Sequence, residues 1–197
     1  MSLAARHARR DQVLEVAARQ FSNRGYHGTS MQNLAEGLGI LRGSIYAHIS
    51  SKEDLLYEIV NRGADRFITR LEEVIASDAP PEDKLRGAIE AHVSTVAEHM
   101  EASTVFLNDW RFLSPERRGE IQAKRDLYEE LMREIVDEGI EWGAFDNGVD
   151  SKFAGILVLS AVNWLYQWYD PEGSLSSQEI AGRMSDMILN GLRARPA

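Results

Sequence analysis

Apolar residues recur along most of the chain at the three- and four-residue spacing of amphipathic helices. The first two segments of this kind have apolar positions at Val13, Leu14, Ala17 and Phe21, and then at Met31, Leu34, Ala35 and Leu38. They end at Gly25 and Gly39, residues that suit helix ends. Thr29 and Gln32 have the spacing of a capping box, so we expect the second helix to begin at Thr29. A third, short helix fits between residues 41 and 49.

The rest of the chain reads as longer helices separated by turn-forming residues. Ser51 suits the N-cap of a long helix that begins at Lys52. Prolines at positions 80, 81 and 115 interrupt the helical pattern, because proline and the residue before it disfavour helix continuation. Further helices are predicted over residues 85–100, 103–112, 115–142, 150–169 and 176–193. No strand-like alternation stands out, so the predicted fold class is all-α.

The predicted helix over residues 150–169 has almost no polar face. A helix that is apolar all round must be covered on every side. In a chain of this size, a second copy can complete that burial, with the helix over residues 176–193 lying beside the first. An ordinary central helix in a monomer is the alternative. The predicted homodimer interface residues are Leu159, Val162, Leu165, Met184 and Ile188.

The charge is distributed unevenly along the chain. Residues 1–52 contain seven Lys and Arg against three Asp and Glu, a net charge of +4, whereas the whole chain carries −9. A basic head on an acidic body is the electrostatic pattern of a DNA-binding module attached to a domain that avoids DNA. Chance segregation of charge in an acidic helical protein is the alternative.

Composition and motifs exclude several other classes. The chain has no cysteine, which rules out disulfides and cysteine-based zinc sites and fits a reducing cytoplasm. The N-terminus lacks the apolar stretch of a signal peptide, and the apolar run over residues 155–162 is too short to span a bilayer, so we expect a cytoplasmic protein without a membrane partner. A Gly-rich phosphate loop and nucleophile motifs are absent, and His92 and His99 are too far apart for a compact metal site. We therefore expect no enzyme activity, no cofactor and no metal.

Residues 28–49 combine two short helices around Gly39 in the manner of a helix-turn-helix. This stretch closely resembles the N-terminal domain of the tetracycline-repressor (TetR) family of bacterial regulators, over about residues 13–57. The resemblance implies a three-helix DNA-binding domain followed by a helical bundle that binds a ligand and dimerises, which we place at residues 1–52 and 53–197. The matching positions include Phe21, Gly25, Tyr26, Thr29, Ser30, Ala35, Gly39, Gly43, Tyr46, His48 and Lys52.

On this resemblance, the DNA contacts lie in and around the second and third helices. Arg42 and Gln32 are the candidates for base edges, because arginine favours guanine and glutamine can pair with adenine. Gly43 leaves room for a close approach. Leu41 departs from the small hydroxyl residue of many relatives, which removes a cap from the third helix. The candidate phosphate contacts are Thr29, Ser30, Ser44, Tyr46, His48 and Lys52.

Residues 163–176, which read NWLYQWYDPEGSLS, resemble a segment of TetR-family members that sense acyl-CoA thioesters. Some of those relatives hold the ligand with an arginine one turn before the second tryptophan. Trp164 stands at that position here, so this chain lacks the arginine that would act together with Trp168 in binding the ligand. The basic residues between positions 111 and 125 can receive CoA phosphates or simply form a solvated face. The candidate ligand-binding residues are Phe67, Phe106, Trp110, Tyr128 and Trp168.

The sequence therefore predicts a repressor that binds a palindromic double-stranded DNA operator as a homodimer and is released by an acyl-CoA effector. Two alternatives stay open. One is a regulator of an efflux pump that senses a lipophilic drug, and the other is a DNA-binding helical protein without a ligand.

Overall fold

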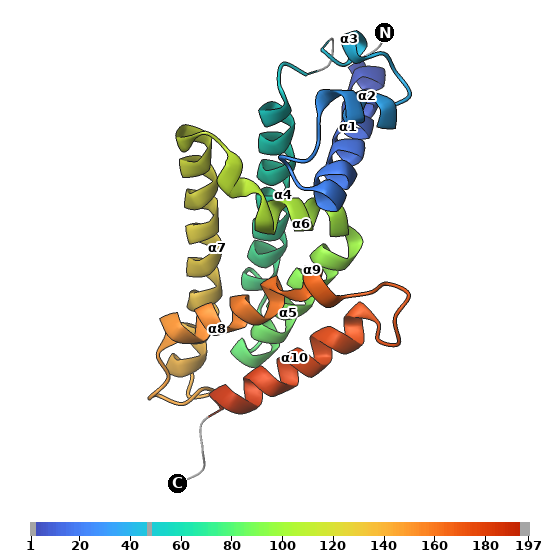
Figure 1. The fold of residues 1–197 in the computed structure, drawn as a ribbon. Helices are drawn as coiled ribbons and strands as arrows, with labels where there is room; N and C mark the ends of the chain where they lie inside the picture. Colours follow the sequence, from blue (N-terminus) through green and yellow to red (C-terminus); the bar gives the residue numbers. More distant parts are fainter. Residues whose placement is uncertain (1–2, 47–48, 194–197) are drawn as a thin grey trace. The chain divides into compact units, whose positions relative to one another are not determined.

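The computed structural model describes residues 3–46 and 49–193 (Figure 1). In these ranges the regular structure is helical, apart from one isolated β-bridge between Phe145 and Arg193. The predicted all-α fold class is confirmed. The chain divides into two compact units: unit 1 contains residues 1–64 and 99–122, and unit 2 contains residues 65–98 and 123–197. The predicted functional division at residue 52 stays a prediction.

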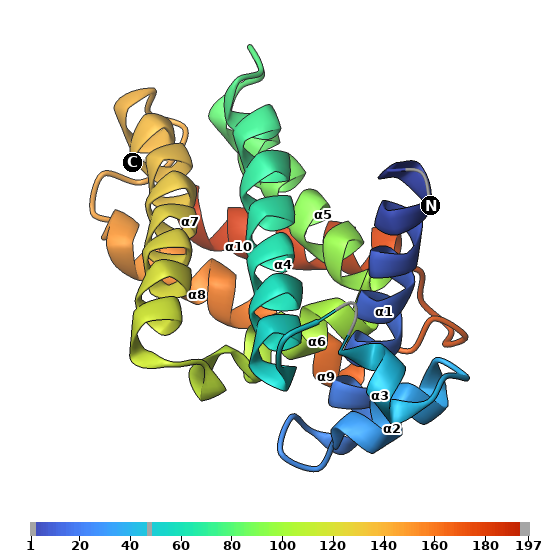
Figure 2. The same cartoon turned by 90° about the horizontal axis from the view of Figure 1, so that it is seen from above.

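Unit 1 is built around the helices at the start of the chain. α1 packs on α2 and on α6, and α2 packs on α3 (Figure 2). Phe21, Leu34, Ile45 and Leu56 are fully buried in its core, at positions that the helical spacing marks as apolar. The unit consists of α1 (Leu3–Arg24), α2 (Met31–Gly37), α3 (Arg42–Ile45), the first part of α4 (Lys52–Ile75), α6 (Met100–Asn108), the 3-10 helix η1 (Trp110–Phe112) and the start of α7 (Pro115–Glu141).

Glycines and caps set the helix ends of unit 1. Gly39 has a φ of 65° between α2 and α3, in the left-handed region that favours glycine, which agrees with the predicted helix end at this residue. The N-cap of α2 is Ser30, which forms a reciprocal capping box with Asn33. The predicted capping box of Thr29 and Gln32 is wrong, because the Thr29 hydroxyl is buried and bonds elsewhere. α3 begins without a side-chain cap, as the leucine at position 41 predicts.

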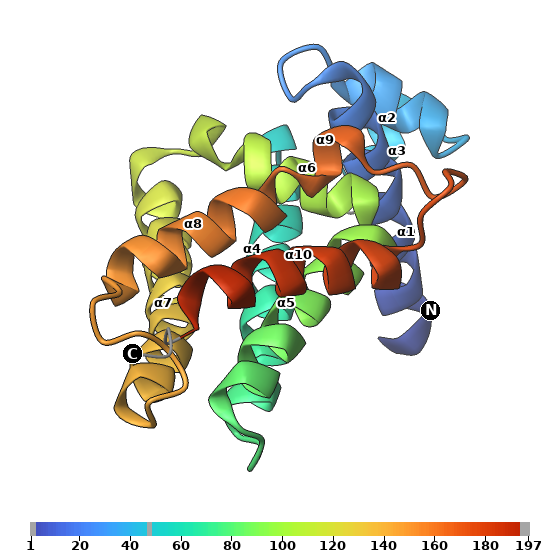
Figure 3. The same ribbon diagram turned by 90° about the horizontal axis from the view of Figure 1, so that it is seen from below.

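The central helix of unit 2 is α5 (Pro81–Glu98). It packs against α8 (Ser151–Asn163), α9 (Leu165–Trp168) and α10 (Ser177–Leu192) (Figure 3). The predicted single helix over residues 150–169 is interrupted at Trp164, where α8 ends and α9 begins. The predicted last helix is confirmed as α10, which starts with a capping box of Ser176 and Glu179. The remainders of α4 and α7 complete the unit. None of the helices in the described part of the chain is long and apolar enough to cross a membrane.

Candidate functional site

The first candidate surface is the exposed side of α3. Arg42, Gly43, Ser44 and Tyr46 are exposed, whereas Ile45 points into the core of unit 1. A Cβ atom built at Gly43 would meet nothing within 4 Å, so the backbone of α3 is open to close approach. A short helix that presents an arginine, two hydroxyls and a bare backbone has the features that the major groove of DNA requires. The candidate His48 lies outside the described residues.

The candidates on α2 are exposed but already engaged. The Gln32 amide donates a hydrogen bond to the Glu36 carboxylate at 2.8 Å. The Ser30 hydroxyl lies 2.7 Å from the Asn33 side chain as part of the cap of α2. Either residue must exchange a surface contact within unit 1 for one to DNA, which makes Arg42 the stronger candidate for base recognition.

Thr29 and Lys52 hold the loop between α1 and α2. The buried Thr29 hydroxyl lies 3.1 Å from the carbonyl oxygen of Gln20 and 3.0 Å from that of Gly25. Lys52 Nζ donates to the carbonyl oxygens of Tyr26 and Thr29, at 2.9 and 2.8 Å, and lies 4.3 Å from the centre of the Tyr26 ring. Burial lowers the pKa of Lys52. The structure thus corrects one prediction, because the Thr29 hydroxyl is not available to a phosphate. Lys52 supports this loop, and its predicted phosphate contact stays a prediction.

Residues far along the chain support the same loop, and the sequence analysis missed them. The Phe112 ring stacks on Tyr26 at 6.0 Å between ring centres and meets His27 edge-on at 4.5 Å. The buried Asp109 carboxylate accepts a hydrogen bond from the Tyr26 backbone N–H, and burial raises the pKa of Asp109. The residues between α6 and α7 therefore belong structurally to unit 1, which carries the candidate DNA-binding surface.

Hydrogen bonds and an ion pair connect the start of α7 to the start of α4 within unit 1. Arg117 donates to the Asp54 carboxylate at 2.5 Å, and the Ser114 backbone N–H donates to Glu53 at 3.0 Å. The Arg117 guanidinium holds the pKa of Asp54 below its usual value. Because Arg117 is committed to this ion pair, and Lys124 is paired with Asp65, two of the basic residues proposed for CoA phosphates already have acidic partners.

In unit 2, two of the candidate ligand residues meet around His92. The Phe67 ring centre lies 4.7 Å from that of His92 and 6.0 Å from that of Tyr128. His92 Nδ1 lies 3.0 Å from the Tyr128 hydroxyl. His92 is 2% exposed, and burial lowers its pKa to about 3, so that the imidazole is neutral at physiological pH. This aromatic cluster is defined as Phe67, His92 and Tyr128.

The other three candidate ligand residues lie in unit 1 or on α9 of unit 2. Phe106 and Trp110 belong to unit 1, where Phe106 packs against the backbone of Gly63: a Cβ built there would lie 3.1 Å from Phe106 Cβ. Trp168, on α9, is 47% exposed and is not part of the aromatic cluster. Phe67 and Tyr128 are thus the candidate ligand residues that unit 2 brings together, and the ligand roles of the other three stay predictions.

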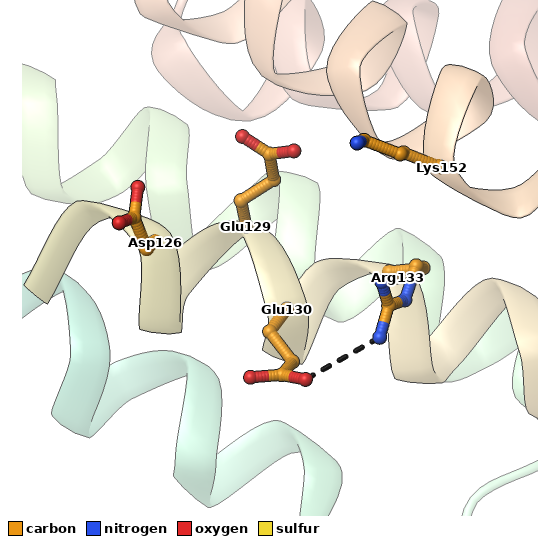
Figure 4. A pocket seen from close by; sticks show the side chains of 5 residues that line it. All are labelled: Asp126, Glu129, Glu130, Arg133 and Lys152. Atoms are coloured by element: carbon orange, nitrogen blue, oxygen red, sulfur yellow. Dashed lines mark hydrogen bonds and ion pairs between the residues drawn. The ribbon is translucent and has the colours of Figure 1, made fainter. Parts of the chain in front are cut away.

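A polar pocket of about 230 Å³ opens between α7 and α8. Figure 4 shows Asp126, Glu129, Glu130 and Arg133 on α7, with Lys152 on α8. Arg133 pairs with Glu130 at 3.3 Å. Because the three carboxylates outnumber the two cations, this pocket disfavours the phosphates of CoA, and we assign no ligand to it.

α8 carries apolar side chains on two opposite stripes. One stripe, with Val162 followed by Leu165 on α9, is fully buried within unit 2, so the prediction of these two residues as interface residues is wrong. Leu159, Met184 and Ile188 are partly buried and stay predictions. α8 and α10 run side by side (Figures 1 and 3), and the exposed large apolar side chains on these two helices are Phe153, Ile156, Leu157 and Met187, with Trp164 at the end of α8.

A helix-turn-helix followed by further helices that form an all-α unit is typical of the class of DNA-binding regulators. Residues 13–59 match the family described as bacterial regulatory proteins, tetR family, and residues 78–192 match the tetracyclin repressor-like C-terminal domain. The chain belongs to the TetR family. The resemblance found in the sequence is confirmed.

The similar proteins are transcriptional regulators. The chain is 29% identical over 187 residues to the HTH-type transcriptional repressor KstR2 of Mycobacterium tuberculosis, covering 94% of this chain and 93% of the relative. The crystal structure of PfmR from Thermus thermophilus is 37% identical with a TM-score of 0.85, covering 93% of this chain and 100% of that one. AibR in complex with isovaleryl coenzyme A and operator DNA is 31% identical with a TM-score of 0.83, covering 91% and 97%. The chain is thus a helix-turn-helix transcriptional repressor of this family, and its relatives are regulators rather than enzymes.

Proposed function

We propose that the protein binds a palindromic operator as a homodimer through α3 and is released from it by an acyl-CoA thioester. The observation that carries the DNA-binding part is the exposed side of α3, where Arg42 and Ser44 flank the bare backbone of Gly43. Two copies present two such helices, so the half-sites should be spaced by about one helical turn of DNA or a multiple of it. In this arrangement Arg42 contacts base edges, and Ser44 and Tyr46 contact phosphates.

The Arg42 side chain is expected to determine base preference. Arg42→Ala should reduce the discrimination between the operator and a site mutated at the contacted base pair by about 5- to 150-fold, the value of one good bidentate contact. The measurement is binding to a set of single-base operator variants at constant salt. Arg19→Ala, which removes an exposed arginine from α1, is the matched control and should leave base preference unchanged. An Arg42→Ala protein with intact base preference would show that another residue determines the sequence.

Two observations support an acyl-CoA effector. The related AibR structure contains isovaleryl coenzyme A together with operator DNA. In this chain, the aromatic cluster lies in the interior of unit 2 and offers an apolar surface for an acyl group. A ligand shifts the protein away from the DNA-binding state only by binding the released state more tightly. Moving the population from one per cent to ninety-nine per cent released requires about 5.5 kcal/mol of that difference.

Titration of effectors against a labelled operator tests this proposal. We expect acyl-CoA thioesters to release the protein, and free CoA and the free acid to act weakly, because neither combines the apolar group with the uncharged carbonyl. Uncharged lipophilic drugs form the comparison series. Release by the drugs alone would favour a regulator of an efflux pump, and no release by either series would favour a DNA-binding protein without a ligand.

A further inference from the structure

His92 leaves one polar atom without a partner in the interior of unit 2. Its Nε2 atom is buried and has no hydrogen-bond partner among the residues that the structure describes, whereas Nδ1 lies 3.0 Å from the Tyr128 hydroxyl. A buried polar nitrogen without a partner costs free energy, and native proteins rarely keep one without a structural or functional reason.

The hydrogen bond to Tyr128 determines which nitrogen carries the proton. A neutral imidazole has one N–H and one bare nitrogen. If Tyr128 donates to Nδ1, only the Nε2–H of His92 lacks a partner. If Nδ1–H donates instead, both the Tyr128 hydroxyl proton and Nε2 lack one, because that hydroxyl has no second partner in the described ranges. The first arrangement costs less, so Nε2–H is a donor in need of an acceptor.

The surroundings of His92 select the kind of acceptor. The Phe67 and Tyr128 rings lie against the imidazole, and the neighbouring α5 residues Ile89 and Val96 are fully buried. A carboxylate would lose its hydration here without a positive charge to compensate, because the imidazole is neutral. An uncharged carbonyl oxygen loses much less. The site therefore favours a neutral carbonyl on an apolar group.

We propose that the His92 Nε2–H donates a hydrogen bond to the carbonyl oxygen of the effector's acyl group. Tyr128 is a positioning residue that fixes the tautomer of His92, and Phe67 covers the acyl chain. The assignment rests on the proposed function for the identity of the ligand as a thioester. It also gives a physical reason for preferring a thioester to the corresponding free acid.

A double-mutant cycle between protein and ligand tests the assignment on the full-length chain. The two ligands are an acyl-CoA thioester and the S-alkyl-CoA thioether of equal length, in which a methylene group replaces the carbonyl. The wild type should bind the thioester about 10- to 100-fold more tightly, the value of a hydrogen bond to a buried donor. His92→Phe should bind both ligands equally. Phe67→Leu alters only the apolar wall and should weaken both ligands by the same factor.

The outcomes separate this assignment from the proposed function. Equal binding of both ligands by the wild type, with release of DNA by both, would overturn the role of His92 and leave the thioester effector in place; an ordered water molecule would then satisfy Nε2. Binding of neither ligand would overturn both proposals. Nitrogen-15 NMR of the ligand-free wild type gives a test that needs no variant. We expect the Nε2–H tautomer, and the Nδ1–H tautomer would contradict the assignment.

Discussion

Placing a carboxylate on the exposed stripe of α8 is expected to yield monomers and to reduce operator affinity by more than about 100-fold, because a buried charge without a partner costs about 3–5 kcal/mol. Leu157→Asp is the sharpest form of this change. Leu157 is 54% exposed in the single chain and has Phe153 one turn before it on the same side of the helix. In the proposed homodimer a second copy covers this stripe. Monomers lose operator affinity because each then brings only one α3 to a two-part site.

Leu127→Asp is the matched control for this prediction. Leu127 is 41% exposed on α7, outside the stripe of α8, so the same chemical change should leave the dimer and operator binding intact. Sedimentation and operator binding are measured together for the wild type and both variants. A wild type that sediments as a monomer at micromolar concentration would contradict the proposed dimer.

The sequence predicted that α8 needs cover on every side, but not which stripe would face the chain's own core. In a helix that is apolar all round, the spacing of apolar residues does not indicate which face is buried in the chain's own core. The choice comes from the neighbours: at Gly155, α8 lies against the backbone of Arg133 on α7, where a Cβ would be in ordinary contact at 3.8 Å from the Arg133 backbone nitrogen. Val162 and Leu165 follow on the buried stripe, whereas the larger Phe153 and Trp164 lie outside. This contact between distant segments is not encoded in local spacing.

The features predicted correctly are those with a local cause. Gly39 marks the turn between α2 and α3 because a left-handed backbone favours glycine, and the apolar positions Phe21 and Leu34 are buried as their spacing indicates. The all-α class follows from such repeats. The missing cap at Leu41 was also evident from residue type alone.

The site residues that sequence reasoning missed or misassigned depend on contacts over long separations. Asp109 accepts from Tyr26, and His92 meets Tyr128 on another helix. Residue type did not distinguish an ordinary buried histidine from one with an unpaired nitrogen. In the same way, residue type at Lys52 indicated a family position associated with DNA contact, but not that this side chain also supports the loop before α2.

Lys52→Met is expected to lower operator affinity by about 10- to 100-fold, because hydrogen bonds to a charged group are worth about 1.5–3 kcal/mol. Methionine keeps the unbranched apolar stem but cannot donate to the carbonyl oxygens of Tyr26 and Thr29, so the loop before α2 loosens and the thermal stability of the protein also falls. The salt dependence of operator binding should not change, because a supporting residue releases no counterions from DNA. Thr29→Val, which removes the second support of the loop, should give the same pattern. A Lys52→Met protein of unchanged stability whose salt slope falls by about one unit would show instead that Lys52 contacts a phosphate directly.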